Sequence, residues 1–151
     1  MTQAPPPSDA SGPSPRAIVE RYFEGIRTGD PEVASLLADD VRWLAPRSSP
    51  VGRRHEGKPA VLELMSTGVG LYDTTRPLEM DFTAIVAEGE RVFVELTLRA
   101  TTRSGEPYAN QYVFVFCVRD ERIAEIHEYL DTLYAQKKLF DPVGEGVAGS
   151  R

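Results

Sequence analysis

Residues 108–131, YANQYVFVFCVRDERIAEIHEYLD, decide the fold class. Side-chain character alternates along residues 108–119 and again along 122–130, with the period of two that is typical of β-strands. Asp120 and Glu121 separate the two runs and suit a tight hairpin turn. The stretch therefore predicts two antiparallel strands joined by a short turn.

The same period continues upstream of this hairpin. Residues 78–86 and 91–101 also alternate, and the connections at 88–90 and 104–106 read EGE and SGE. A glycine flanked by charged or small residues is a common hairpin connection. The four alternating runs together predict an antiparallel meander.

The N-terminal part of the chain shows helical spacing instead. Ser14 can cap a first helix, and Pro15 sits at its first position, where a missing amide donor costs nothing. Apolar residues recur at helical spacing from Ile18 to Ile26, and Gly29 ends the helix. We expect this apolar stripe to pack on the sheet.

Three further segments lie between this helix and the meander. We expect a short helix over residues 31–40, a strand over 41–44, a loop over 46–57 and a third helix over 58–68, with Pro31 and Pro59 at the helix starts. Helices grouped ahead of the strands predict an α+β fold. Its three N-terminal helices pack on one face of a curved, mostly antiparallel sheet.

The length of 151 residues fits one domain. Residues 1–14 and 142–151 are rich in Pro, Gly and Ser, which predicts a disordered N-terminal arm and a flexible C-terminal tail. The folded domain is then expected over residues 15–141. Cys117 is the sole cysteine of the chain, so an intrachain disulfide is excluded.

Charge and hydropathy exclude two classes of partner. The formal charge is −6, and the only dense basic cluster, Arg53-Arg54 with His55, is followed at once by Glu56, so the chain is not expected to bind nucleic acid. No apolar run approaches the length of a membrane span, and the N-terminus lacks an apolar signal core. We therefore expect a cytoplasmic protein that does not bind membranes.

The strand over residues 108–119 carries an aromatic row. The row consists of Tyr108, Asn110, Tyr112, Phe114 and Phe116, which share one strand face. Apolar walls with a few polar groups favour a small-molecule pocket. The alternative is an aromatic core with Asn110 near its edge.

The last strand offers titratable groups. His127, Tyr129 and Asp131 share one face, and Glu128 lies on the other. An Asp in an apolar pocket loses solvation, so its pKa rises and it can carry protons near neutral pH. The alternatives are that Asp131 caps the helical turn over 132–138 and that His127 is an ordinary half-buried strand residue.

Two aromatic residues outside the meander are also candidates. Trp43 either floors the pocket or fills the core, and Tyr22 either projects its hydroxyl into a cavity or is a core residue. Tyr72 and Asp73 are candidates for a lid. The chain has two histidines, far apart in sequence, so no metal site is expected.

Six segments are similar to a known superfamily. They are RYFE (21–24), TGD (28–30), LADDVRW (37–43), YANQY (108–112), RDERI (119–123) and EYLD (128–131). In these segments the chain resembles the SnoaL-like and ketosteroid-isomerase-like family of the nuclear-transport-factor-2-like superfamily. The resemblance implies a cone-shaped fold with an internal pocket, and a homodimer formed through the outer face of the sheet.

The resemblance also implies roles for single residues. Tyr22 matches the oxyanion-binding Tyr of ketosteroid isomerases, and Asp131 matches the acid/base Asp of SnoaL-type cyclases. Ala45 stands where the isomerases have their general-base Asp. Leu96 and Leu98 stand where limonene-type epoxide hydrolases have an Arg and an Asp.

Two hypotheses for the function follow. In the first, the chain is an enzyme without a cofactor that acts on a hydrophobic, polyketide-like or cyclic small molecule. The reaction is a cyclisation, an isomerisation or an epoxide opening, and the catalytic residues are Asp131, His127 and Tyr22. The substrate-binding residues are then Trp43, Tyr108, Asn110, Tyr112, Phe114 and Tyr129. In the second, it is a non-catalytic small-molecule-binding or interaction domain, which the apolar residues at the positions of the family's catalytic groups favour.

Overall fold

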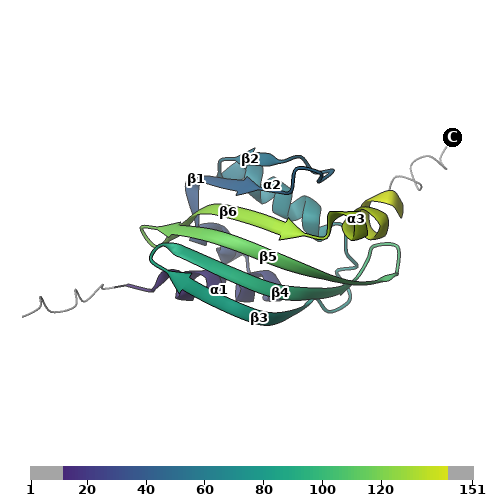
Figure 1. The fold of residues 1–151 in the computed structure, drawn as a ribbon, viewed down its shortest axis with the longest axis horizontal. Helices are drawn as coiled ribbons and strands as arrows, with labels where there is room; N and C mark the ends of the chain where they lie inside the picture. The colour runs from purple at the N-terminus through teal and green to yellow at the C-terminus, as the bar shows by residue number, and fades with distance from the viewer. Residues whose placement is uncertain (1–11, 143–151) are drawn as a thin grey trace, which may run out of the picture.

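The structure, a computed structural model, describes residues 12–142. Helices cover one face of a curved six-stranded sheet (Figure 1). The elements are α1 (Pro15–Thr28), the 3₁₀-helix η1 (Pro31–Leu36), β1 (Leu37–Leu44), β2 (Arg54–Glu56), α2 (Lys58–Val69), β3 (Glu79–Glu88), β4 (Arg91–Thr101), β5 (Pro107–Arg119), β6 (Arg122–Leu130), α3 (Thr132–Ala135) and the π-helical turn η2 (Gln136–Phe140). The predicted arm and tail lie almost entirely outside the described residues. The α+β architecture is confirmed.

Helix α1 has the ends that its sequence predicts. The Ser14 hydroxyl oxygen accepts a hydrogen bond from the Ala17 amide at 3.1 Å. Gly29 ends the helix in the left-handed region at φ +69°, where a residue without Cβ meets no strain. The apolar stripe that includes Ile18 and Val19 is fully buried against the inner face of the sheet.

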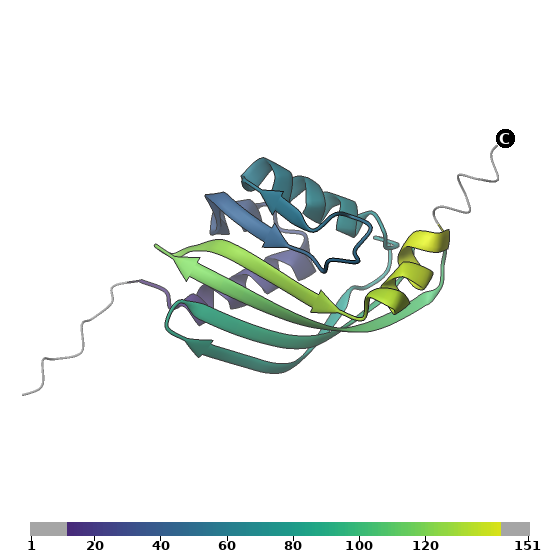
Figure 2. The same ribbon diagram turned by 45° about the horizontal axis from the view of Figure 1, so that its top comes forward.

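The sheet has the strand order β2-β1-β6-β5-β4-β3. Strands β3 to β6 form the predicted antiparallel meander, and β1 joins its edge by pairing parallel with β6. Figure 2 shows α1 and α2 behind the same face of this sheet, and α3 beyond the end of β6. The sheet and the two longer helices therefore enclose the core between them.

Two details differ from the sequence-based expectation. Strand β1 begins at Leu37, which pairs with Ile123, so Asp39 and Asp40 are exposed strand residues rather than the end of a helix. Residues 54–56 of the expected loop form β2, which pairs antiparallel with β1. Both differences arise because pairing with a neighbouring strand satisfies the backbone amides and carbonyls, a gain that a local pattern does not reveal.

The register between β5 and β6 decides which side chains face the core. Phe114 lies opposite Glu128, and Tyr112 lies opposite Leu130. Residues directly opposite each other in a sheet share a face, so Glu128 belongs to the inner, aromatic face. The neighbouring side chains of β6 therefore point to the outer face.

The outer face of the sheet carries exposed apolar side chains. Val86, Phe93 and Val115 form a cross-strand row, and Val86 and Phe93 are 59% and 44% exposed. Tyr129 on β6 is 56% exposed on the same face.

Within the described part of the chain, no helix is long and apolar enough to cross a membrane.

Candidate functional site

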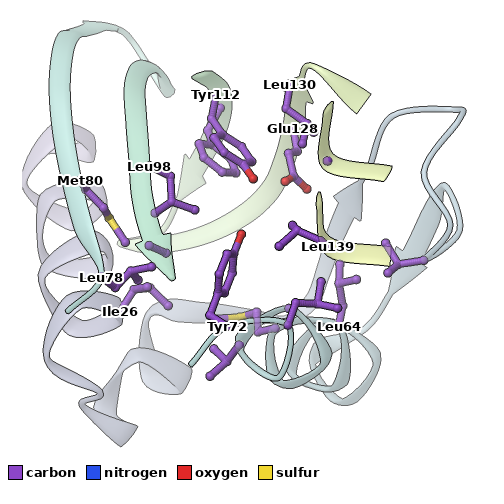
Figure 3. A pocket seen from close by; sticks show the side chains of 18 of the residues that line it. Ile26, Leu64, Tyr72, Leu78, Met80, Leu98, Tyr112, Glu128, Leu130 and Leu139 are labelled. Carbon is purple, nitrogen blue, oxygen red and sulfur yellow. The ribbon is translucent and has the colours of Figure 1, made fainter. Parts of the chain in front are cut away.

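A cavity of about 650 Å³ lies between the inner face of the sheet and the helices. Its volume is in the range of pockets that hold drug-sized ligands. Figure 3 shows its walls, which come from α1, α2, the connection to β3 and the strands of the meander. Aliphatic side chains make up much of this wall, among them Ile26, Leu64, Leu78, Met80, Leu98, Leu130 and Leu139.

Glu128 is the carboxylic acid inside this apolar space. Its carboxylate points into the cavity (Figure 3), and the part of its surface that remains accessible opens there. The Trp43 indole Nε1–H donates a hydrogen bond of 3.0 Å to Glu128 Oε2. Burial raises the pKa of Glu128 above its ordinary value, and the hydrogen bond from Trp43 offsets part of this rise. Within the described residues, no hydrogen bond reaches the second carboxylate oxygen, Oε1.

Two tyrosine hydroxyls point toward the same space as the Glu128 carboxylate. Tyr112 comes from β5 and Tyr72 from the connection between α2 and β3 (Figure 3). Burial raises the pKa of both phenols, so both stay protonated and can donate hydrogen bonds at neutral pH. The Glu128 acid and these two neutral donors therefore face the same part of the cavity.

A chain of hydrogen bonds fixes the Tyr112 hydroxyl from behind. The hydroxyls of Tyr112 and Tyr108 are 2.8 Å apart. The Asn110 amide donates to the Tyr108 hydroxyl at 3.0 Å and to the main-chain carbonyl of Asp131 at 3.1 Å. Tyr108 and Asn110 are themselves buried, so these linked hydrogen bonds are shielded from water.

Tyr72 is also held in place by its neighbours in the chain. The connection that carries it is bonded to the end of β4 and to the turn that follows. The Asp73 amide donates to the Thr101 carbonyl at 2.9 Å, and the Arg103 amide donates to the Leu71 carbonyl at 2.9 Å. These two backbone hydrogen bonds flank Tyr72 on both sides. Its ring is therefore part of a fixed wall of the cavity.

Charged residues at the rim of the cavity are paired. Arg27 donates to Glu24 at 2.6 Å, and Arg76 lies 3.6 Å from Asp73. These side chains are largely exposed, so their ion pairs contribute little to stability. No group of His, Cys, Asp and Glu in residues 12–142 is arranged to hold a metal ion.

The structure brings four of the expected site residues into the cavity wall: Tyr22, Trp43, Tyr112 and Phe114. Tyr22 packs edge-on against Phe116 with ring centroids 5.4 Å apart, and burial raises the pKa of its phenol. Tyr108 and Asn110 lie one layer behind the wall. They support Tyr112 and are not in the wall that a ligand meets.

The expected placement of His127, Tyr129 and Asp131 in the cavity is wrong. All three alternate with inward-facing residues of β6, because Glu128 and Leu130 occupy the inner face. The Asp131 carboxylate instead caps α3 by accepting a hydrogen bond from the Tyr134 amide at 3.0 Å, which was the alternative considered from the sequence.

His127 lies on the outer face of the sheet. Its Nε2 is 3.5 Å from a carboxylate oxygen of Glu125. Partial burial lowers the pKa of His127, and the nearby guanidinium groups of Arg91 and Arg42 lower it further. The strand therefore separates this histidine from any ligand in the cavity.

Sequence reasoning missed Glu128 as a site residue, although a signal was present. Ile126 and Leu130 flank it at the alternate positions, and two apolar residues at that spacing indicate the core face of a strand. On that face, Glu128 is the polar exception. A polar residue in an apolar row is the more informative observation.

The fold has many solved relatives. A comparison with curated proteins found no match to the chain. An NTF2-like protein from Burkholderia xenovorans LB400 is 26% identical, with 81% of this chain and 92% of that chain covered and a TM-score of 0.66. TerC, co-crystallised with polyporic acid, is 20% identical over 83% of this chain and 98% of that chain, with a TM-score of 0.72.

A third similar solved structure is a protein with a ketosteroid isomerase-like fold. It is a protein from Catenulispora acidiphila DSM 44928 in complex with trimethylamine, 14% identical over 81% of this chain and 91% of that chain, with a TM-score of 0.67. At these identities the last two structures show a shared fold alone. The family profile of the SnoaL-like domain matches residues 19–126, most of the described chain. The chain therefore belongs to the SnoaL-like domain family.

Proposed function

We propose that the chain binds a hydrophobic cyclic molecule in the cavity and moves a proton with Glu128, without a cofactor. The observation that carries this proposal is the position of Glu128, a partly buried carboxyl that points into an apolar cavity opposite two tyrosine hydroxyls. Burial raises the pKa of the carboxyl toward neutral pH, where an acid/base group works best. Glu128 takes the role that the sequence analysis gave to Asp131 and His127.

The reaction class follows from what these groups can do. Ionised Glu128 removes a proton from a carbon next to a ligand carbonyl, and the Tyr72 and Tyr112 hydroxyls stabilise the resulting enolate oxygen by hydrogen bonds. Return of the proton to another carbon completes an isomerisation. Attack of the enolate carbon on a second carbonyl of the same molecule completes an aldol cyclisation, with the proton ending on the new alkoxide.

Solved relatives support a binding role for the cavity. TerC was crystallised with polyporic acid, and the Catenulispora protein was crystallised with trimethylamine. Both are small molecules, and both proteins share the fold of this chain. The apolar wall of the present cavity suits a ligand with a large hydrocarbon surface.

The test uses the single tryptophan of the chain as a reporter. Trp43 lies in the cavity wall, so ligand entry changes its fluorescence directly. Cyclic ketones and polyketide-like compounds are screened for binding in this way, and those that bind are assayed for turnover. Glu128→Gln is expected to bind the ligand and to lose turnover by about a hundredfold or more.

Asp131→Asn is the matched control, because it removes a carboxylate from the residue that directly follows the same strand and keeps an oxygen that can cap α3. It is expected to keep full turnover. Turnover that survives in Glu128→Gln and disappears in Asp131→Asn would restore the role that the family resemblance implies for Asp131.

A second candidate function is ligand binding without catalysis. Leu96 and Leu98 line the cavity where related enzymes carry charged groups, and Ala45 is buried. Under this alternative, compounds that bind to the wild-type protein are recovered unchanged after long incubation. Glu128→Gln then alters affinity alone.

We further propose that two copies associate through the outer face of the sheet. The apolar row of Val86, Phe93 and Val115, with Tyr129 beside it, supplies the exposed hydrophobic surface that an interface needs. Sedimentation velocity at tens of micromolar is expected to show a dimer, and Phe93→Glu is expected to give a monomer. A wild-type monomer at that concentration refutes the assembly.

A further inference from the structure

The Glu128 carboxylate lacks a cationic partner in the described part of the chain. The hydrogen bond it receives comes from the neutral indole of Trp43, and the ion pairs of residues 12–142 do not include it. The two arginines of the cavity rim are paired with acids, Arg27 with Glu24 and Arg76 with Asp73. A carboxylate that faces an apolar cavity loses much of its hydration, which is costly unless a positive charge meets it, and here a ligand is the available source.

Aromatic rings line the same cavity as this carboxylate. The rings that line the cavity are Tyr22, Phe23, Trp43, Tyr72, Tyr112, Phe114 and Phe140. Phe114 stacks on Tyr112 with ring centroids 5.7 Å apart and meets Trp43 edge-on at 6.3 Å, so the three rings form one continuous patch. The faces of such rings are electron-rich and attract organic cations, and Trp attracts them most strongly.

We propose that the ligand of this cavity is a hydrophobic organic cation, an amine or quaternary ammonium whose positive nitrogen lies beside the Glu128 carboxylate and against the aromatic patch of Trp43, Tyr112 and Phe114. This inference rests on the proposed function, because it names the substrate class of the same site. A carboxylate ligand is disfavoured, since Glu128 would repel it. The chain's formal charge of −6 also attracts cations.

A cationic substrate also suits the proposed proton transfer. Burial alone favours the protonated form of Glu128, which cannot act as a base. A positive nitrogen near the carboxylate favours the ionised form. The substrate would therefore generate the base that acts on it, and it would acidify the C–H bonds next to its own nitrogen.

The test compares two probes of the same shape. Phenyltrimethylammonium carries a permanent charge, and tert-butylbenzene is its neutral counterpart, with carbon in place of nitrogen. Binding of each to the full chain is followed by Trp43 fluorescence, with calorimetry as a second readout. The cation is expected to bind at least about tenfold more tightly than the neutral probe, the size of one modest charge or cation–π contribution.

The pH dependence separates the charge of Glu128 from the aromatic contribution. Because the probe's charge is fixed, its affinity rises with pH as Glu128 ionises, and the affinity of tert-butylbenzene stays constant. Tyr22, Tyr72 and Tyr112 face the cavity as neutral phenols, since burial raises the pKa of each.

The charged groups at the rim do not produce the same pH dependence. Hydrogen bonds from Thr75 hold the pKa of Asp73 below its ordinary value, so Asp73 stays ionised above pH 5. Arg27 and Arg76 are permanent cations. The two histidines of the chain lie outside the cavity wall.

Glu128→Gln is expected to lose both the preference for the cation and its pH dependence, while binding tert-butylbenzene as the wild type does. Equal affinity of the two probes for the wild type overturns the cationic ligand and leaves the proposed proton transfer standing. A preference that persists unchanged in Glu128→Gln also overturns it, because the carboxylate then plays no part. The proposed function itself is decided separately, by turnover in the same variant.

Discussion

Replacing Glu128 with Gln should make the folded protein more stable above neutral pH. The wild-type carboxylate gives up much of its hydration in an apolar cavity, and within residues 12–142 it receives a single hydrogen bond, from Trp43. The Gln amide oxygen can accept the same indole hydrogen bond and carries no charge to desolvate. We expect a gain of about 1–2 kcal/mol in the free energy of unfolding, the size that single stabilising substitutions commonly reach.

The gain should depend on pH in a defined direction. Burial raises the pKa of Glu128 in the folded state above its unfolded value of 4.5. Between these two pKa values the folded chain binds more protons than the unfolded chain, so wild-type stability falls as pH rises through the window. The difference between Glu128→Gln and the wild type should therefore be small at pH 4 and complete at pH 8.

Urea denaturation followed by Trp43 fluorescence and by circular dichroism measures the difference at both pH values. If the same variants are compared by thermal melting, each kcal/mol of unfolding free energy corresponds to a shift of about 2–4 °C in the melting temperature for a chain of this size. Glu125→Gln is the matched control, because Glu125 lies on the opposite face of the same strand and is paired with Arg42. That variant should lose up to about 1 kcal/mol.

Two results would refute the reasoning about Glu128. One is a Glu128→Gln protein that is less stable than the wild type at pH 8, which would mean that the carboxylate is compensated in the cavity. The other is an equal difference at pH 4 and pH 8. In that case the effect comes from packing rather than from charge.

Three further predictions concern other residues. Asp131→Ala removes the cap of α3 and should cost about 1 kcal/mol of unfolding free energy in urea denaturation, with ligand affinity unchanged, whereas Asp131→Asn should be close to wild type. Trp43→Phe removes the hydrogen bond that lowers the pKa of Glu128. The carboxyl resonance of Glu128 in ¹³C NMR should therefore titrate at higher pH than in the wild type, and an unchanged titration contradicts the assigned contact. Gly25→Ala in α1 places a Cβ against the buried Val33 side chain and should lower the free energy of unfolding by about 1–3 kcal/mol. Thermal melting measures this loss. A melting temperature equal to that of the wild type would show that η1 can shift to make room for the added methyl group.

Most of the fold could be predicted because its signals are local. Alternation over residues 78–130 marks the four strands of the meander, and Ser14, Pro15 and Gly29 mark the ends of α1. The parallel pairing of β1 with β6 and the short β2 could not be predicted in this way. Both depend on contacts between segments that are distant in the sequence.

The candidate site was harder to predict than the fold, because alternation alone does not say which strand face is inside. The choice of His127 and Asp131 followed the chemistry of those residues, and the register of β6 against β5 placed Glu128 inside instead. Tyr72 lies in a connection without periodicity. Its position depends on backbone hydrogen bonds to the turn between β4 and β5.

The parallel pairing of β1 with β6 also constrains when the protein can fold. Leu44 pairs with His127, so β1 stays unpaired on one edge until most of the domain has been synthesised. Contacts between such distant segments slow folding, and an unpaired strand edge can recruit other chains while it waits. During synthesis, α1 and β1 should therefore stay susceptible to proteases and available to chaperones until β6 has left the ribosome.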